Sequence, residues 1–373
     1  MNAQELRFRF DQPWSSTTTP DVDQQLSEVD LAAERHLMAR GIRVVPALFP
    51  ELSDLVARST QKILGESIVA DVYVVRDTDL QARCINPHRS HRPIIVLNSG
   101  LITFLSTDEL SFVIGHELAH FLYKHSARSP DDKNLTPAQR LQILAQSRAA
   151  EISADRVGLA ACTSRTAAFR AITKVASGLD ERFIRIDVNA LLQQLRDLKD
   201  HGASPDEAAS THPMFLLRLR ALLLFELSDL WAQWRNMSDR PQVTAREMDE
   251  RIHGELCSLS GIDSVKDGSE AVRMASLWAT VFIFTIDDQI TDAERTFLRE
   301  NFGNESADKA ARFAENYGIE SLHKKYHSAL KGLVHLPKPQ RHRFTAYLGN
   351  LLNGSGVGSK HPLLADAVQL LHF

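Results

Sequence analysis

The chain has 373 residues, of which 43% are hydrophobic and 24% are charged, and this length allows two globular domains. Its formal net charge of -4 gives no overall electrostatic reason to bind nucleic acid or an anionic membrane. Three scattered cysteines, Cys84, Cys162 and Cys257, cannot form a disulfide framework and favour packed thiols in a reducing compartment.

The N-terminal ten residues are too polar for the core of a signal peptide. The apolar stretches are interrupted by arginines or fall short of the roughly 20 residues that a membrane-spanning helix needs. We therefore expect a cytoplasmic protein with neither a nucleic-acid partner nor a membrane partner.

The first part of the chain mixes helix and strand patterns. An arm over residues 1–25 contains a Ser/Thr/Pro run, and helical spacing of apolar residues follows it. Short β-branched segments bounded by turn formers then predict strands, with a polar loop between them. The predicted elements are helices over 26–39 and 51–64 and strands over 68–75 and 93–97.

Helices dominate from residue 106 onward. Ser106 to Glu109 fits a capping box that starts a helix running to about His125, and Thr136-Pro137 announces a long helix to about Cys162. A polar break over residues 236–242 marks the domain boundary. The remaining predicted helices lie at 165–176, 188–199 and 214–230, and beyond the break the chain is helical except for a Gly/Ser connector over 354–359.

These elements predict an α+β fold that is mostly α, with a small sheet followed by an all-α domain. We expect the arm at 1–25, the first domain at 26–240 and the helical domain at 241–373.

Residues 116–120 form an H-E-x-x-H motif within a predicted helix. His116 and His120 are four residues apart, so they project from one helix face and can grip one ion, and neutral imidazoles suit zinc. Glu117 lies beside them and can accept a proton from a metal-activated water. The motif therefore predicts a zinc site, one ion per chain, with Glu117 as general base.

A third protein ligand must come from elsewhere, because Tyr123 and Ser126 stand where the extended metzincin pattern needs Gly and His. Glu151 on the next helix can supply it, and Asp155, four residues later, can accept the other N–H of a zinc-bound histidine. The alternative is a solvated helix face on which these carboxylates pair with neighbouring arginines.

His125 follows His116 by nine residues. It lies too far along the helix to bind the same ion. We expect it to be a structural residue or to lie at the rim of the site.

From about Ile68 to Leu227 the sequence resembles the gluzincin peptidases that include the heat-shock protease HtpX and the CAAX prenyl proteases. The resemblance rests on the strand and turn before the helix, on His116 to His120, on Glu151 to Asp155, and on His212-Pro213 with Arg218. It implies a zincin-type peptidase domain.

The resemblance also implies two roles. His212 would contact substrate or the tetrahedral intermediate near the metal, and Arg218 would hold the active-site helices together. The alternative for residues 211–213 is simply the start of the helix that follows, with a proline in its first turn.

Where the family usually presents an Asn-Ala pair on the strand that pairs with substrate, this chain has Cys84-Ile85-Asn86-Pro87. We expect a substrate strand to lie along the sheet edge near Ile94 to Leu97, where backbone pairing would bind many sequences.

The helical domain resembles TerB-like domains of tellurite resistance over Phe284 to Arg295. That family often has clustered carboxylates there, so Asp287, Asp288, Asp292 and Glu294 are candidates for a divalent ion. The alternative is a capped helix start, because Asp292 also suits a helix N-terminus.

The sequence thus predicts a zinc metalloendopeptidase that cleaves soluble or unfolded polypeptides, with a protein partner conceivable for the helical domain. The rival is a non-catalytic, zinc-stabilised interaction module that acts through that helical domain. Retention of Glu117 favours the enzyme, because a structural zinc site needs ligands but no base.

Overall fold

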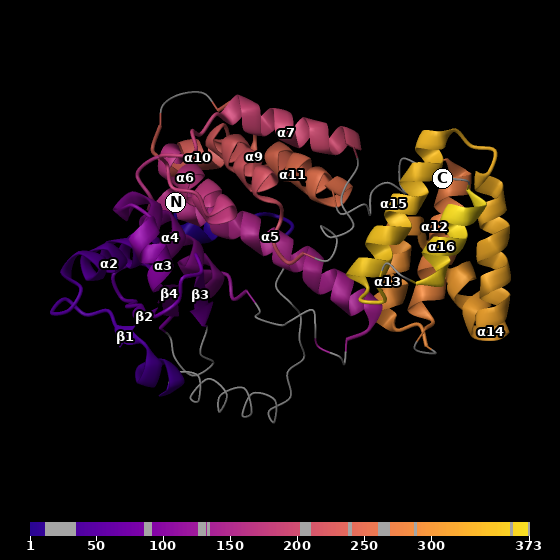
Figure 1. Cartoon of the computed structure of the whole chain (residues 1–373), viewed down its shortest axis with the longest axis horizontal. Helices are drawn as coiled ribbons and strands as arrows, with labels where there is room; N and C mark the ends of the chain where they lie inside the picture. The colour runs from indigo at the N-terminus through magenta and orange to yellow at the C-terminus, as the bar shows by residue number, and fades with distance from the viewer. Residues whose placement is uncertain are drawn as a thin grey trace. The chain divides into compact units, whose positions relative to one another are not determined.

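The computed structural model describes most of the chain in ten stretches, and Figure 1 shows their helices and strands. The predicted acidic pair Asp287 and Asp288 lies outside them, as do Asn86 and Pro87 of the substrate-strand motif. The described residues are 1–11, 35–85, 92–125, 132, 135–201, 210–237, 241–259, 269–286, 289–358 and 361–371.

Contacts divide the chain into two compact units, each built from three stretches. The single boundary after residue 240 therefore stays a prediction. Unit one comprises Met1–Ser126, Ala149–Leu192 and Phe215–Glu250, and unit two comprises Ala127–Arg148, Gln193–Met214 and Arg251–Phe373.

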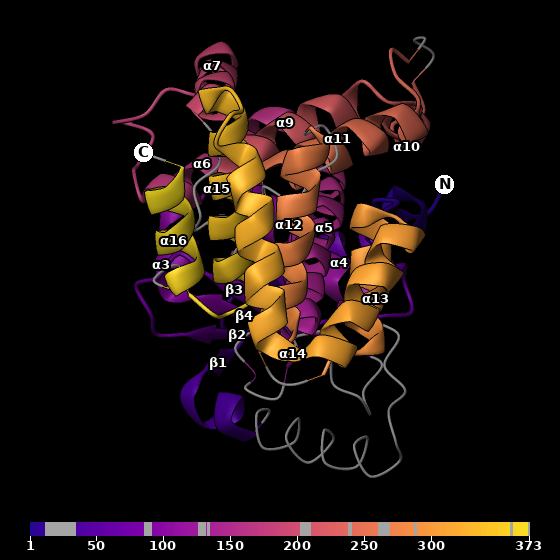
Figure 2. The same ribbon diagram turned by 90° about the vertical axis from the view of Figure 1, so that its right-hand side faces the viewer.

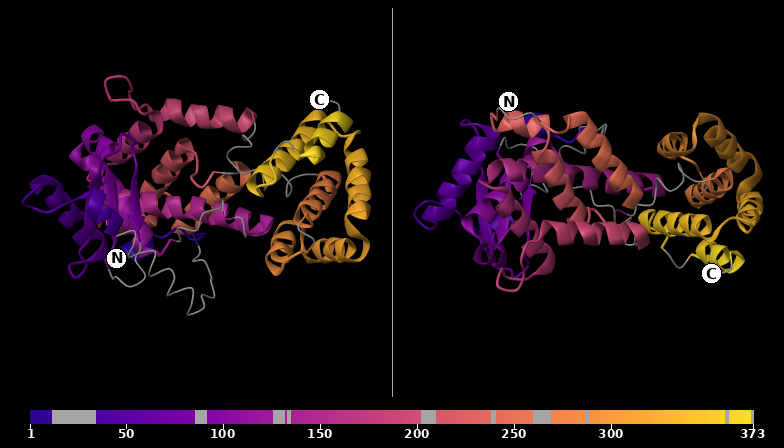
Figure 3. Two further views of the ribbon diagram at one scale, coloured as in Figure 1. Left: turned by 60° about the horizontal axis from the view of Figure 1, so that its bottom comes forward. Right: turned by 90° about the horizontal axis from the view of Figure 1, so that it is seen from above.

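A four-stranded sheet in the order β1-β2-β4-β3 lies in unit one (Figures 1 and 3). Strands β2 and β4 are parallel, and the outer strands pair antiparallel to them. The strands are β1 (Ile42–Arg43), β2 (Asp71–Val75), β3 (Ala82–Ile85) and β4 (Ile94–Asn98).

Two expectations for this region are wrong. The predicted loop between the strands contains β3, whose Ala-Arg-Cys-Ile sequence has little β-branched signal and which forms by pairing with β4. The segment expected at the sheet edge, Ile94 to Leu97, is instead an inner strand, fully buried and paired on both sides. The outer strand on this side is β3.

Among the residues that the structure describes, six α-helices lie wholly within unit one. The predicted capping box is present at the start of α4, where the Ser106 hydroxyl and Glu109 carboxylate cap each other's backbone. These helices are α2 (Pro50–Leu64), α3 (Ser99–Phe104), α4 (Thr107–Leu122), α6 (Arg165–Ser177), α9 (Phe215–Glu226) and α10 (Asp229–Trp234).

The single helix predicted over residues 214–230 is wrong in one respect, because it divides into α9 and α10. Ser228 is the cause: its side chain accepts from the Trp231 backbone and caps a new helix. Three longer helices contribute residues to both units, namely α5 (Pro137–Ala161), α7 (Val188–His201) and α11 (Ala245–Leu259).

The first eleven residues pack into unit one. Their short 3-10 helix η1 (Ala3–Leu6) is buried at Ala3 and Leu6, and the Tyr123 hydroxyl donates to the Ala3 carbonyl at 2.6 Å. The backbone N–H of Phe8 donates to the Ser153 hydroxyl at 3.0 Å. These contacts bring Asp11 to the buried side of α5.

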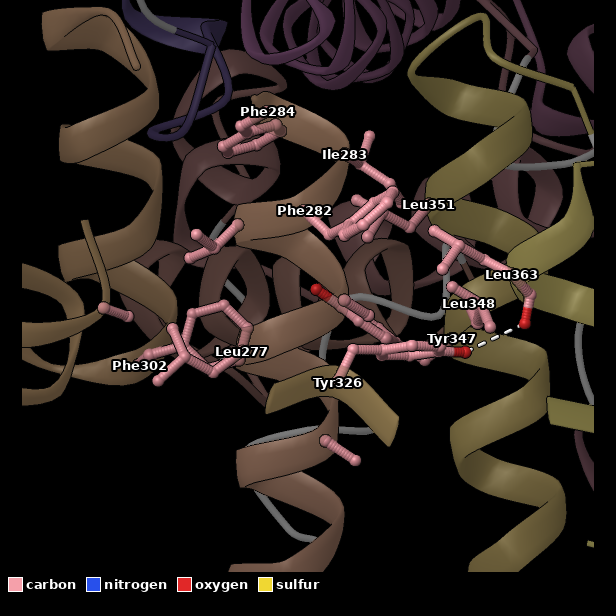
Figure 4. Close-up of a cluster of buried hydrophobic side chains, with 14 of the residues drawn as sticks. Leu277, Phe282, Ile283, Phe284, Phe302, Tyr326, Tyr347, Leu348, Leu351 and Leu363 are labelled. Atoms are coloured by element: carbon pink, nitrogen blue, oxygen red, sulfur yellow. Dashed lines mark hydrogen bonds between the residues drawn. The ribbon is translucent and has the colours of Figure 1, made fainter. Parts of the chain in front are cut away.

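Unit two is helical, with α12 at its centre. The apolar residues of α12 pack against α14 and α15; Figure 2 shows these helices and Figure 4 shows the buried side chains. Its own helices are α12 (Glu270–Phe284), α13 (Asp292–Phe302), α14 (Asn304–Leu333), α15 (Lys338–Gly354) and α16 (Pro362–Leu370).

The predicted fold class, α+β and mostly α with a small sheet, is confirmed. No described helix is both long enough and apolar enough to cross a membrane. No disulfide joins the three cysteines, all of which lie in described residues.

Candidate metal centre

Helix α4 places the imidazole rings of His116 and His120 next to each other. His116 and His120 lie one turn apart on its buried face, with ring centroids 5.0 Å apart and Nε2 atoms 3.2 Å apart. At this separation the two Nε2 atoms cannot both carry a proton that points at the other. Either one of them is unprotonated, or both face a shared cation.

Helix α5 supplies a carboxylate at the same point. Oε2 of Glu151 lies 3.4 Å from Nε2 of His116, and its Oε1 lies 3.5 Å from Nε2 of His120. The ligand atoms of all three residues lie within 4.8 Å of one another. Two imidazoles and a carboxylate are a donor set that suits zinc and leaves a coordination position for water.

Two glycines let α4 and α5 approach closely enough to build this group. A Cβ atom on Gly115 would collide with Cβ of Ala161 and lie 3.1 Å from Cα of Gly158. A Cβ on Gly158 would lie 2.8 Å from the carbonyl oxygen of Phe112. Gly115, which precedes His116, therefore lies against the turn of α5 that follows Asp155. The absence of a side chain at this position allows the short distance between α4 and α5.

Asp155 contacts the imidazole of His116 on the side away from Glu151 and His120. Its Oδ1 lies 3.0 Å from Nδ1 of His116, so an N–H there donates to the carboxylate and Nε2 is left to face the metal position. Arg218 donates to both oxygens of Asp155, at 2.8 and 2.6 Å. Burial raises the pKa of Asp155, but Arg218 and His116 outweigh this and hold the pKa below its usual range.

The alternative of a solvated helix face does not describe these carboxylates. Glu151 is 6% exposed and Asp155 is 0% exposed. The neighbouring arginines bond elsewhere, since Arg148 donates to the Ser210 carbonyl and Arg156 donates to Asp249. Arg218, more than 60 residues away in sequence, is the cation that pairs with Asp155.

The group attracts positive charge. Burial by itself lowers the pKa of His116, but the carboxylates of Glu151 and Asp155 outweigh it and raise that pKa to about 10. Carboxylates that stabilise a proton here also stabilise a divalent cation, which must displace that proton to bind.

Glu117 is buried beside the histidines on α4. Burial and the nearby Glu151 raise its pKa to about 7, although His116, Arg218 and the backbone N–H of Cys84 on β3 stabilise the charged form. A carboxyl with a pKa near neutrality can both accept and return a proton, which general acid–base catalysis requires.

A chain of side chains behind His120 was not predicted. Nδ1 of His125 lies 2.8 Å from Nδ1 of His120, and Nε2 of His125 lies 2.8 Å from Oδ2 of Asp11. The Ser153 hydroxyl donates to that same oxygen at 2.7 Å. The candidate ligand group does not include His125, whose role outside it stays a prediction, and nothing in the sequence pointed to Asp11.

His212 falls in a stretch assigned to unit two, in the turn before α9. Its backbone N–H donates to the Ser210 hydroxyl at 3.2 Å, and that hydroxyl donates back to the His212 carbonyl at 2.7 Å. The role of His212 at the metal remains a prediction.

Asp292 and Glu294 lie at the start of α13, where Glu294 is the partner of Thr291 in a capping box.

Comparison with known proteins bears on the same region. Residues 70–136 and 133–225 match the model of Peptidase family M48. The chain is also 28% identical over 153 residues to plastoglobule-localized metallopeptidase 48, chloroplastic, of Arabidopsis thaliana. The comparisons support the M48 metallopeptidase family for this part of the chain.

The alignment with the plant protein covers 35% of this chain and 44% of that relative, so the chain spans less than half of its length. The M48 match ends at residue 225, and the TerB-like resemblance of the C-terminal region remains a prediction. No solved structure matches the chain.

Proposed function

We propose that unit one is a zinc-dependent endopeptidase in which His116, His120 and Glu151 hold the metal and Glu117 is the general base. The observation that carries the proposal is the convergence of three ligand atoms within 4.8 Å beside a buried glutamate. The match to Peptidase family M48 over the same residues supports it.

Zinc bound in this group would supply a Lewis acid for the scissile carbonyl and a water of lowered pKa as nucleophile. Glu117 would accept a proton from the attacking water and return it to the amide nitrogen that leaves. Asp155 and Arg218 keep His116 oriented throughout. No covalent intermediate between enzyme and substrate is needed.

The outer strand β3 is the proposed place for the substrate backbone. It pairs with β4 on one side, and its Cys84 backbone N–H bonds Glu117. A peptide added along β3 would therefore run beside the general base, held by main-chain hydrogen bonds that tolerate many sequences. We propose soluble or unfolded polypeptides as substrates, with His212 as a candidate donor to the oxyanion.

The rival function is a zinc-stabilised module that binds a protein partner through its helical unit without catalysis. A structural site gains nothing from a buried carboxyl beside its ligands, since burying that group costs free energy. The burial of Glu117 therefore favours the peptidase. The cytoplasmic location remains a prediction from the cysteine usage, the polar N-terminal residues and the short apolar stretches of the sequence.

The proposal is tested by measuring zinc content and cleavage of an unfolded, casein-like substrate on the same preparations. Wild-type protein should bind zinc at the M48-like site and cleave, lose cleavage with a chelator and regain it with zinc. Glu151→Ala should lose that zinc and the activity, whereas the matched control Glu181→Ala, at an exposed side chain, should keep both.

Two outcomes separate the possibilities. Zinc bound at Glu151 without cleavage of any unfolded substrate would favour the interaction module over the enzyme. Unchanged zinc content in Glu151→Ala would remove that residue from the metal centre.

A further inference from the structure

A second group of metal-ligating side chains lies in unit two. His323 and His327 stand one turn apart on α14, with ring centroids 4.5 Å apart, and Asp366 on α16 faces them. Their ligand atoms lie within 4.8 Å of one another, the same limit that the group in unit one meets.

Both histidines lie near the same carboxylate oxygen of Asp366. Oδ2 of Asp366 lies 3.6 Å from Nε2 of His327 and 3.9 Å from Nε2 of His323. Both distances exceed a hydrogen bond, yet they are close to the roughly 3.4 Å that separates two ligands placed about 2.1 Å from a tetrahedral zinc ion. Oδ2 of Asp366 therefore lies outside hydrogen-bonding distance of both histidines, at separations close to those between two ligands of one ion.

The helices that carry these residues are held in register by a buried hydrogen bond. The hydroxyl of Tyr326 donates to the Leu363 carbonyl at 2.9 Å, and both residues are buried (Figure 4). Tyr326 precedes His327 directly, and Leu363 lies three residues before Asp366 on α16. The backbone positions of the group are therefore fixed by the core and not by the surface side chains.

Charge and access also suit a cation. The side chains of His327 and Asp366 are each 35% exposed, so an ion and its water can enter. Lys325, which lies between the two histidines in sequence, has its ammonium 5.2 Å from the ring centroid of Phe313 and 5.8 Å from that of Trp278. That places its charge on rings at another face of α14.

We propose that His323, His327 and Asp366 form a second transition-metal site, suited to zinc, that links α14 to α16. Two imidazoles and one carboxylate favour zinc and its neighbours over magnesium or calcium, which prefer all-oxygen sites. The fourth position is open to water or to a ligand from a partner. This inference is independent of the peptidase proposal, because it uses no residue of unit one.

The site would act on the stability of the last described helix. α16 is nine residues long, too short to be helical without its packing against the rest of unit two. An ion that binds only when α16 is in place adds its binding free energy to that packing. Zinc availability would then control how firmly the C-terminal helix is attached.

The test is equilibrium dialysis of the full chain against zinc, with elemental analysis, together with backbone hydrogen exchange of residues 362–370. Wild type should bind one equivalent more than His327→Ala or Asp366→Asn, and zinc should slow exchange of α16 by tenfold or more only in wild type. The matched control His335→Ala removes an exposed histidine of the same unit and should behave as wild type.

The comparison with unit one separates the two sites. His116→Ala should leave the zinc effect on α16 intact, whatever happens to peptidase activity. Equal zinc stoichiometry in wild type, His327→Ala and Asp366→Asn would overturn the proposal. So would an extra equivalent that leaves exchange of α16 unchanged, because the ion would then lie elsewhere.

Discussion

Asp155 holds the ring of His116 in the candidate metal centre. It is completely buried, and its two oxygens are shared between His116 and the guanidinium of Arg218. Such a carboxylate fixes the ring of a metal-binding histidine and makes the histidine a better ligand, while the arginine offsets the cost of burying the charge.

Asp155→Asn keeps the shape of the side chain and removes its charge. We expect zinc affinity to fall by about 10-fold to 100-fold, the usual cost of losing a partner behind a metal ligand. A chelator competition titration measures this, with Asp54→Asn, an exposed aspartate of the same unit, as control. Unchanged affinity in Asp155→Asn would show that the contact with His116 does not support the ligand.

His125 should act on affinity without being a ligand, because it contacts Nδ1 of His120 and is itself held by Asp11. In His125→Ala we expect full occupancy at saturating zinc but an affinity about 10-fold lower. The same titration gives both numbers. A loss of stoichiometry would make His125 a ligand, and wild-type affinity would make it only a packing residue.

The site residues differ in how visible they are in sequence. His116, Glu117 and His120 share one helical turn, so spacing alone groups them. Glu151 and Asp155 became candidates only because the H-E-x-x-H motif requires a third ligand from elsewhere, and the role of Arg218 came from the resemblance alone. Asp11 carried no signal, since it reaches His125 across 114 residues through the packing of the first eleven residues.

At the level of elements, the crossing of α4 and α5 sets the site. Gly115 and Gly158 meet where the helices are closest, so any added side chain must push one helix away. This displacement would separate His116 from Glu151, which come from the two different helices. The geometry of the centre therefore depends on two residues that have no functional group.

Gly158→Ala should cost about 1 to 3 kcal/mol of stability, the usual price of overpacking, and weaken zinc binding. Its Cβ would lie 2.9 Å from ring atoms of Phe112 as well as against the backbone. Gly332→Ala is the control, because a Cβ there meets nothing within 4 Å. Denaturant unfolding and zinc titration of both variants test this, and equal behaviour would contradict the close crossing.

Prediction of elements succeeded where local signals are strong. Capping at Ser106 and at Thr136-Pro137 located the starts of α4 and α5. Strand β3 was missed because its stability comes from pairing with β4, and pairing partners are not visible in a single sequence. For the same reason, β4 was expected at the edge of the sheet, although it is an inner strand.

On the scale of the whole molecule, the chain forms two units from interleaved stretches, which composition and polar breaks cannot reveal. Within the described part of the chain, one candidate metal group lies in each unit. Zinc should therefore stabilise the units separately, each through its own site.

Removing zinc should lower the melting temperature of unit one. At a free zinc concentration 100 times the dissociation constant, binding contributes about 2.7 kcal/mol, which corresponds to roughly 5 to 10 °C for a unit of this size. Calorimetry with and without chelator measures the shift. Glu151→Ala should abolish it and His327→Ala should not, and a shift that persists in Glu151→Ala would contradict the assignment.

In the proposed peptidase, Glu117 moves the proton during zinc-dependent hydrolysis of the peptide bond. The most direct measurement compares cleavage of an unfolded substrate by wild type and Glu117→Gln at equal, measured zinc content. We predict that zinc binding is retained and that the cleavage rate falls at least about 100-fold, the range for loss of a general base. Equal rates at equal zinc content would contradict the claim, since a contaminating protease or another base would then explain the cleavage.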